Sequence, residues 1–323
     1  MQVPTLQRRM IESVTTHPLD PEDAPVAATF RAMVSAAKGA RRGIEARGQF
    51  DALMEGVLPR EDVTFEEDTL GGIPGVWVRP TDWRLDEVIL HLHGGWFNFG
   101  SAKAYRHLVG HIAARAGARA FIADYRRAPE NPFPAATDDV MVCYRALVDQ
   151  GFSRIALSGD SAGGNLALAI ASQVIGNKDT MSTTLIGVAV LSPVTDLTLS
   201  GASYATRAEA DPLFTRLQVS DLVRAYLGAA DPKHPLASPL FGRQAGLPPI
   251  RIHVGDDEVL LDDSLRYVDR AVAAGVDAHV DVWTGMFHGF PASIGKFKAA
   301  AKSLDAVGTF LTDRLRATNP TSA

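Results

Sequence analysis

The strongest chemical signal in the sequence is a serine between two glycines, in the segment Gly159-Asp160-Ser161-Ala162-Gly163. A short apolar run, Ile155-Ala156-Leu157, precedes this segment and an alanine-rich helical pattern follows it, so the serine is expected on a strand-to-helix turn. A serine hydroxyl is a weak nucleophile, and it must be exposed where a base can reach it. The glycines remove Cβ atoms that would crowd such a turn. The pattern predicts a nucleophile at Ser161.

A second pair of glycines lies upstream, in His93-Gly94-Gly95-Trp96-Phe97, directly after the strand-like run Val88 to Leu92. Paired glycines after a strand let backbone N–H groups turn into a cavity, where they can stabilise an oxyanion. We therefore expect oxyanion donors at the N–H groups of Gly94, Gly95 and Ala162. His93 is expected to brace this loop rather than to carry protons.

An acid and then a histidine should follow the nucleophile along the chain. Three acids, Asp256, Asp257 and Glu258, come after the strand-like run Ile250 to Val254, and His288 comes after the run Val280 to Trp283. His288 would take the proton of Ser161, and the acid would hold the imidazole in the correct tautomer. The residue types alone leave all three acids open.

The elements that must position these residues alternate between strands and helices. Eight strand-like runs and helical patterns near residues 103–117, 135–150, 162–176, 262–275 and 296–315 predict an α/β fold with a mostly parallel eight-stranded sheet and helices on both faces. The runs begin at Val63, Val76, Val88, Ala120, Ile155, Val188, Ile250 and Val280. Residues 1–55 look helical, and residues 197–248 interrupt the alternation with one helical piece near 219–227.

Composition narrows the function classes. The chain has 323 residues, a net charge of −5 and a single cysteine, Cys143, which argues against nucleic acid, an anionic membrane surface and a disulfide framework. No segment is apolar over the length of a membrane span, and the first twenty residues lack a signal-peptide core. We expect a cytoplasmic protein that needs neither metal nor cofactor, because no convincing ligand cluster or phosphate loop stands in the sequence.

Taken together, the motifs resemble the hormone-sensitive-lipase-like serine esterases of the α/β-hydrolase superfamily, called family IV among bacterial lipolytic enzymes. The matching segments are His93-Gly94-Gly95, residues 124–136, Gly159 to Asn165, Ser192-Pro193 with Asp196, Gly255 to Glu258 and Gly285 to Phe290. The resemblance implies Ser161 as nucleophile, His288 as base and Asp257 as acid, because the family acid is the second residue after the glycine. It also implies a helical cap from residues 1–55 and 197–248 over a core of residues 56–196 and 249–323, and a homodimer formed through an edge strand.

One departure from the family concerns Trp96, which stands where the third glycine is usual. An indole there could reshape the substrate pocket, for which the candidate lining residues are Trp96, Phe97, Leu213, Phe214 and Phe287. The expected reaction is hydrolysis of small to medium uncharged carboxylic esters through an acyl-enzyme. An amidase or a lactonase would use the same triad, and a non-catalytic relative that binds small ligands is the third hypothesis.

Overall fold

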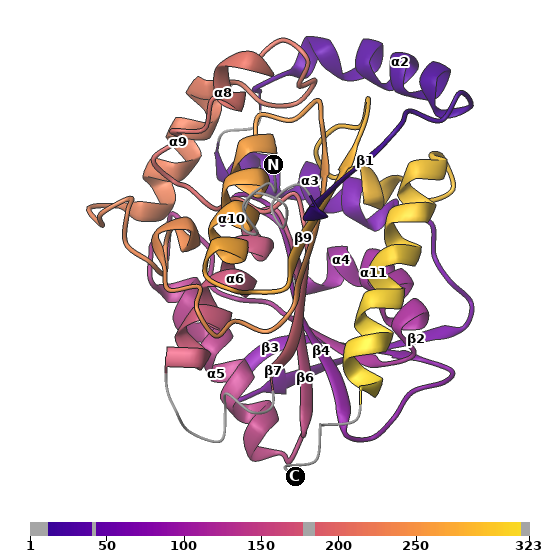
Figure 1. Cartoon of the computed structure of the whole chain (residues 1–323), viewed down its shortest axis with the longest axis vertical. Helices are drawn as coiled ribbons and strands as arrows, with labels where there is room; N and C mark the ends of the chain where they lie inside the picture. The colour runs from indigo at the N-terminus through magenta and orange to yellow at the C-terminus, as the bar shows by residue number, and fades with distance from the viewer. Residues whose placement is uncertain (1–11, 41–42, 177–184, 318–323) are drawn as a thin grey trace, which may run out of the picture.

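A single sheet of nine strands forms the centre of the computed structural model, which describes residues 12–40, 43–176 and 185–317 (Figure 1). The strand order is β1-β9-β8-β7-β6-β4-β5-β3-β2. Only the pairs β2–β3 and β3–β5 are antiparallel. The strands are β1 (Val14–His17), β2 (Val63–Leu70), β3 (Ile73–Pro80), β4 (Glu87–Leu92), β5 (Arg119–Ala123), β6 (Arg154–Asp160), β7 (Leu185–Leu191), β8 (Ile250–Gly255) and β9 (Ala278–Trp283).

The eight strands expected from the sequence are confirmed, but the predicted number of strands is wrong. The ninth strand, β1, lies in the N-terminal segment that was expected to be helical, and it pairs in parallel with β9. Its Val14-Thr15-Thr16 run is rich in β-branched residues, which favour strands. Four residues are too few for a periodicity to stand out, so this strand was missed.

Helices cover both faces of the sheet, as the alternation predicted (Figure 1). One face packs against α4 (Ala102–Ala116) and α11 (Lys298–Arg316), and the other packs against α5 (Ala135–Asp149), α6 (Ala162–Gly176) and α10 (Leu261–Ala273). All six residues of the central strand β4 are buried, as expected for a strand covered on both faces. The sheet is therefore a rigid base on which the turns at its carboxyl edge can hold reactive groups.

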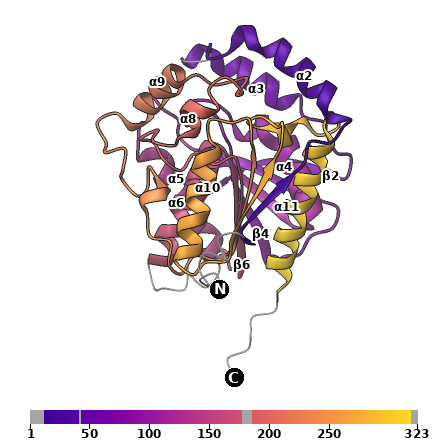
Figure 2. The ribbon, with the colours of Figure 1, turned by 45° about the horizontal axis from the view of Figure 1, so that its top comes forward.

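The remaining helices gather above that carboxyl edge. Two come from the N-terminal segment, α2 (Asp23–Val34) and α3 (Arg47–Glu55), and two come from the expected insertion, α8 (Ser203–Thr206) and α9 (Arg216–Leu227) (Figure 2). Short 3₁₀ helices are η1 (Ser35–Ala37), η2 (Ile44–Ala46), η3 (Pro239–Phe241) and η4 (Phe290–Ser293). Over the described ranges, every helix is too short or too polar to cross a bilayer.

Candidate active site

Ser161 stands on a sharp turn between β6 and α6, with a φ of 53°. The flanking glycines are required by close packing: a Cβ on Gly163 would lie 1.9 Å from the Leu92 carbonyl oxygen, and one on Gly159 would lie 2.4 Å from the Gly163 carbonyl oxygen. The backbone on both sides of the serine is also tied down. Its N–H donates to the Leu191 carbonyl at 2.8 Å, and its carbonyl accepts the Val194 N–H at 3.1 Å. The turn therefore holds the serine in a strained conformation that places it at the carboxyl edge of the sheet.

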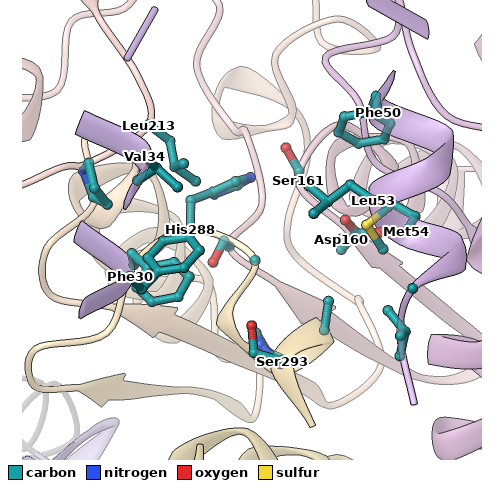
Figure 3. Close-up of a pocket in the computed structure, with 18 of the residues that line it drawn as sticks. Phe30, Val34, Phe50, Leu53, Met54, Asp160, Ser161, Leu213, His288 and Ser293 are labelled. Carbon is teal, nitrogen blue, oxygen red and sulfur yellow. The ribbon is translucent and has the colours of Figure 1, made fainter. Parts of the chain in front are cut away.

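His288 lies on the turn after β9, and its ring points toward Ser161 across the cavity (Figure 3). Its Nδ1 is 2.8 Å from Oε2 of Glu258. Burial alone would lower the pKa of His288, but the charge of Glu258 and the hydrogen bond to it outweigh burial, and the pKa is raised above the usual 6.5. An acidic partner at Nδ1 leaves Nε2 unprotonated in the neutral ring, so that this nitrogen can accept a proton.

The acid that contacts the histidine is Glu258, not Asp257 as the family pattern implied. The carboxylate of Glu258 is fully buried and also accepts hydrogen bonds from the Gly255 N–H and the Ser192 hydroxyl, both at 2.7 Å. Asp257 instead pairs with Arg31 of α2.

The reason for this difference is the direction of the backbone in the turn. Asp256 accepts the Gly285 N–H at 2.6 Å, and the Asp257 N–H donates to the Met286 carbonyl at 3.1 Å. These two hydrogen bonds fix Asp256 and Asp257 against the turn that carries His288, and the Asp257 side chain points toward Arg31 of α2. The third acid then points into the site, and the extra methylene of glutamate carries its carboxylate to the imidazole.

The glycine loop after β4 contributes Gly95 and Trp96 to the wall of the cavity that contains Ser161. Gly95 has a φ of 113°, and a Cβ there would lie 2.5 Å from the Phe99 carbonyl oxygen. Gly94 is not among the residues that line this cavity, and it lies against the Asp160 carboxylate, where a Cβ would be 2.3 Å from Oδ2. Ala162 is the first residue of α6, so its N–H has no acceptor within that helix. His93 braces the loop as expected, because its ring stacks on Tyr125 with centroids 4.2 Å apart.

Asp160 connects the nucleophile turn to the glycine loop. Its Oδ2 accepts the Tyr105 hydroxyl at 3.0 Å. Burial raises the pKa of Asp160 to about 7, although the hydrogen bonds from Tyr105 and Gly94 act in the opposite direction. The Asp160 carboxyl group therefore lies between the turn that carries Ser161 and the glycine loop that contains Gly94.

The cavity above Ser161 has a volume of about 750 Å³ and is mainly apolar. Four of the five predicted lining residues, namely Trp96, Leu213, Phe214 and Phe287, line it. The prediction for Phe97 is wrong, because its ring stacks on Tyr226 with centroids 3.7 Å apart and is fully buried in the core. The N-terminal helices α2 and α3 contribute further apolar residues that were not predicted, among them Phe30, Val34, Phe50, Leu53 and Met54 (Figure 3).

The indole of Trp96 lies at the wall of the cavity. It is 3% exposed, and its ring meets Phe214 edge-on with centroids 5.5 Å apart. Phe214 in turn meets the ring of His288 with centroids 4.9 Å apart. The side chain that replaces the family's third glycine is therefore part of an aromatic wall that reaches His288.

Two arginines connect the helices α2 and α3 to the turns around the site. Arg31 of α2 binds Asp257 and the carbonyl of Gly285, and it also binds the carbonyl of Ala210 in the insertion. Arg47 of α3 donates to the Asn98 carbonyl at the end of the glycine loop, at 2.7 Å. Sequence reasoning missed both residues, because a single arginine in a polar helix carries no signal of its partner. Across the described part of the chain, no group of three or more His, Cys, Asp or Glu side chains could hold a metal ion.

Comparisons with known proteins agree with this architecture. A family model described as α/β hydrolase fold matches residues 89–292. An acetyl-hydrolase of Streptomyces hygroscopicus is 38% identical over 246 residues, which cover 75% of this chain and 81% of that protein. An esterase of Acinetobacter venetianus is 36% identical over 229 residues, covering 70% and 75% of the two chains.

A crystal structure of an esterase from the bacterial hormone-sensitive lipase family superposes with a TM-score of 0.84 at 35% identity, covering 92% of this chain and 99% of that one. With a serine turn, a histidine and an acid assembled at one cavity, the chain belongs to the α/β-hydrolase fold family, as a hormone-sensitive-lipase-like serine esterase that hydrolyses carboxylic esters.

Proposed function

We propose that Ser161, His288 and Glu258 form the catalytic triad of this esterase. The observation that carries the proposal is the 2.8 Å contact between His288 Nδ1 and the buried Glu258 carboxylate, at a cavity that His288 and Ser161 both line. In the first half-reaction, His288 Nε2 takes the Ser161 proton as Oγ attacks the ester carbonyl, and the protonated ring then gives that proton to the departing alkoxide. In the second, water gives a proton to His288 and attacks the acyl carbonyl, and His288 then returns that proton to Ser161 Oγ as the carboxylic acid leaves.

We propose that the oxyanion is held by the N–H groups of Gly95, Trp96 and Ala162. Gly94 leaves the set inferred from the sequence because it does not line the cavity, whose wall includes Gly95 and Trp96. Trp96 enters it because it lines the cavity next to Gly95, and its φ of 51° continues the turn that glycines usually make. A donor needs only a backbone N–H, so the indole does not impair this role.

The proposed substrates are small to medium uncharged esters. Support comes from the lining of the cavity, where the aromatic wall of Trp96, Phe214 and Phe287 faces aliphatic cap residues. Such a surface favours the burial of an acyl chain by about 25 cal/mol per Å² removed from water. Matched ester, lactone and anilide substrates would separate an esterase from a lactonase or an amidase, since the triad serves all three reactions.

The test of the function is hydrolysis of nitrophenyl esters from acetate to octanoate by the wild type and by Ser161→Ala. We expect turnover by the wild type that Ser161→Ala abolishes, and labelling of Ser161 by an organophosphonate. A wild type without turnover at any chain length and without labelling would refute the proposal.

We further propose that residues 1–55 and 197–248 act as a cap over the core of residues 56–196 and 249–323. The ties from Arg31 and Arg47, and the Asp211 carboxylate that accepts the Val259 N–H at 2.9 Å, support this division. Residues 1–11 and 41–42 of the cap lie outside the described residues. A cytoplasmic location and a homodimer are also proposed, to be tested by cell fractionation and by light scattering.

A further inference from the structure

Ser192 is a buried residue beside the triad to which the proposed mechanism assigns no role. It follows β7 directly, and its side chain is 1% exposed. Its hydroxyl donates to Oε1 of Glu258 at 2.7 Å, while Oε2 of the same carboxylate contacts His288. A hydrogen bond to a charged acceptor is stronger than one between neutral groups. Ser192 therefore restrains the oxygen of Glu258 that the histidine does not use.

The backbone of Ser192 is held in a costly conformation. Its φ is 45°, in the left-handed region that favours glycine, although the residue carries a Cβ. The Ser192 N–H donates to the His253 carbonyl of β8 at 2.7 Å, which ties the residue to the strand that leads into the acid turn. A strained conformation of this kind persists only where the surrounding structure fixes it, and such positions cluster at active sites.

The same short segment also holds the nucleophile. The residue before Ser192, Leu191, accepts the Ser161 N–H at 2.8 Å, and Val194 donates its N–H to the Ser161 carbonyl at 3.1 Å. Residues 191–194 thus bind Ser161 through backbone hydrogen bonds and Glu258 through the Ser192 side chain. The distance between nucleophile and acid is set by this one piece of chain.

We propose that Ser192 is a positioning residue for the triad, which fixes the Glu258 carboxylate relative to Ser161 and thereby aims the His288 ring. The inference rests on the proposed role of Glu258 as the acid. Ser192 borders the cavity, but its hydroxyl is bound to Glu258. The inference therefore predicts that loss of the hydroxyl lowers kcat far more than it changes KM, because the hydroxyl acts through Glu258 and His288.

The test is a double-mutant cycle with Ser192→Ala, Glu258→Gln and the double variant, followed by kcat on nitrophenyl butyrate. Ser192→Ala should reduce kcat by about 10- to 100-fold, as expected for a hydrogen bond to a charged group. In the Glu258→Gln background, the same change should cost less than about twofold, because residues that act as one unit are not additive. Ser192→Cys, which keeps a weaker donor, should fall between the wild type and Ser192→Ala.

A matched control is Ser203→Ala. Ser203 is equally buried, and its hydroxyl donates to the carbonyl of Val259, next to Glu258 in the chain, without contact to the carboxylate. We expect Ser203→Ala to lower Tm as much as Ser192→Ala does, with kcat within about twofold of the wild type. Equal kcat losses for the two serine variants, or additive losses in the cycle, would overturn the role of Ser192. A fully active Glu258→Gln would instead overturn the triad itself, so the two failures are distinguishable.

Discussion

The variant Glu258→Gln, in which an NH₂ group replaces one carboxylate oxygen, should lose nearly all esterase activity. In Glu258→Gln, the amide oxygen can still accept the Gly255 N–H and the Ser192 hydroxyl, which both reach Oε1 in the wild type. The amide NH₂ then faces His288 Nδ1 and donates to it. The neutral ring must carry its proton on Nε2, which is the wrong tautomer to accept the Ser161 proton. The fold is preserved, but the base is disabled.

The size of this effect follows from comparison with other triads. Replacement of the acid by its amide costs about 10⁴-fold in kcat where the geometry stays intact. That loss corresponds to about 5 kcal/mol of transition-state stabilisation. The buried position of Glu258 gives no access to water that could replace the carboxylate.

Asp257→Asn is the matched comparison, one residue away. The Asp257–Arg31 pair is partly exposed, with side chains 24% and 28% accessible, and such pairs contribute about 1 kcal/mol or less. Arg31 also keeps the carbonyls of Ala210 and Gly285. We expect Asp257→Asn to lower kcat/KM by no more than about fivefold.

The assay is kcat/KM on nitrophenyl butyrate, with active sites counted by organophosphonate and folding checked by Tm. The ratio of the two variants' activities should be about 10³. An Asp257→Asn variant as inactive as Glu258→Gln, with both folded, would refute the assignment of the acid and restore the family pattern.

Three more predictions concern the histidine, the cap and the indole. The acid limb of kcat/KM should have its midpoint above pH 6.5, because only neutral His288 is active and its pKa is raised. Residual activity of Glu258→Gln should move this limb to lower pH, because the charge and hydrogen bond of Glu258 that raise the pKa are lost while burial still lowers it, and an unmoved limb would contradict the pairing. Arg31→Gln should raise KM by about 3- to 10-fold and keep kcat within about twofold, because it releases α2 from Asp257 and Gly285. A loss confined to kcat would show that the Arg31 contacts act on the chemical step. Trp96→Gly should raise the ratio of octanoate-ester to acetate-ester hydrolysis by about tenfold, because it opens the wall of the cavity beside Phe214. An unchanged dependence of activity on chain length would show that the indole does not restrict the length of the acyl chain.

The sequence was sufficient for the elements whose chemistry is local. The glycines around Ser161 are demanded by contacts with the adjacent strand, so the turn could be predicted from five residues. His288 could be predicted as well, because it follows the last core strand at the edge where Ser161 lies. The helices α2, α3 and α9 could also be anticipated, from their helical patterns and from the break in the alternation, whereas their action as a cap stays a proposal.

The acid could not be chosen from the sequence, because three acidic side chains follow one another and only the turn's hydrogen bonds decide which of them faces the imidazole. The same holds for Gly94, which lies against the carboxylate of Asp160 from a different segment. The role of Ser192 depends on a contact across 66 residues of chain, which no local pattern encodes.

The strand β1 has a consequence for assembly. It occupies the free edge of β9, so a second molecule cannot extend the sheet there except through four residues of β1. The opposite edge is β2, in which three consecutive acidic residues, Glu66, Glu67 and Asp68, are exposed. Charges on an edge strand oppose pairing with another strand. Two molecules joined through β1 would share only a short ladder, and two joined through β2 would bring these acidic side chains close together. An edge-to-edge pair would thus separate on dilution unless other surfaces also met.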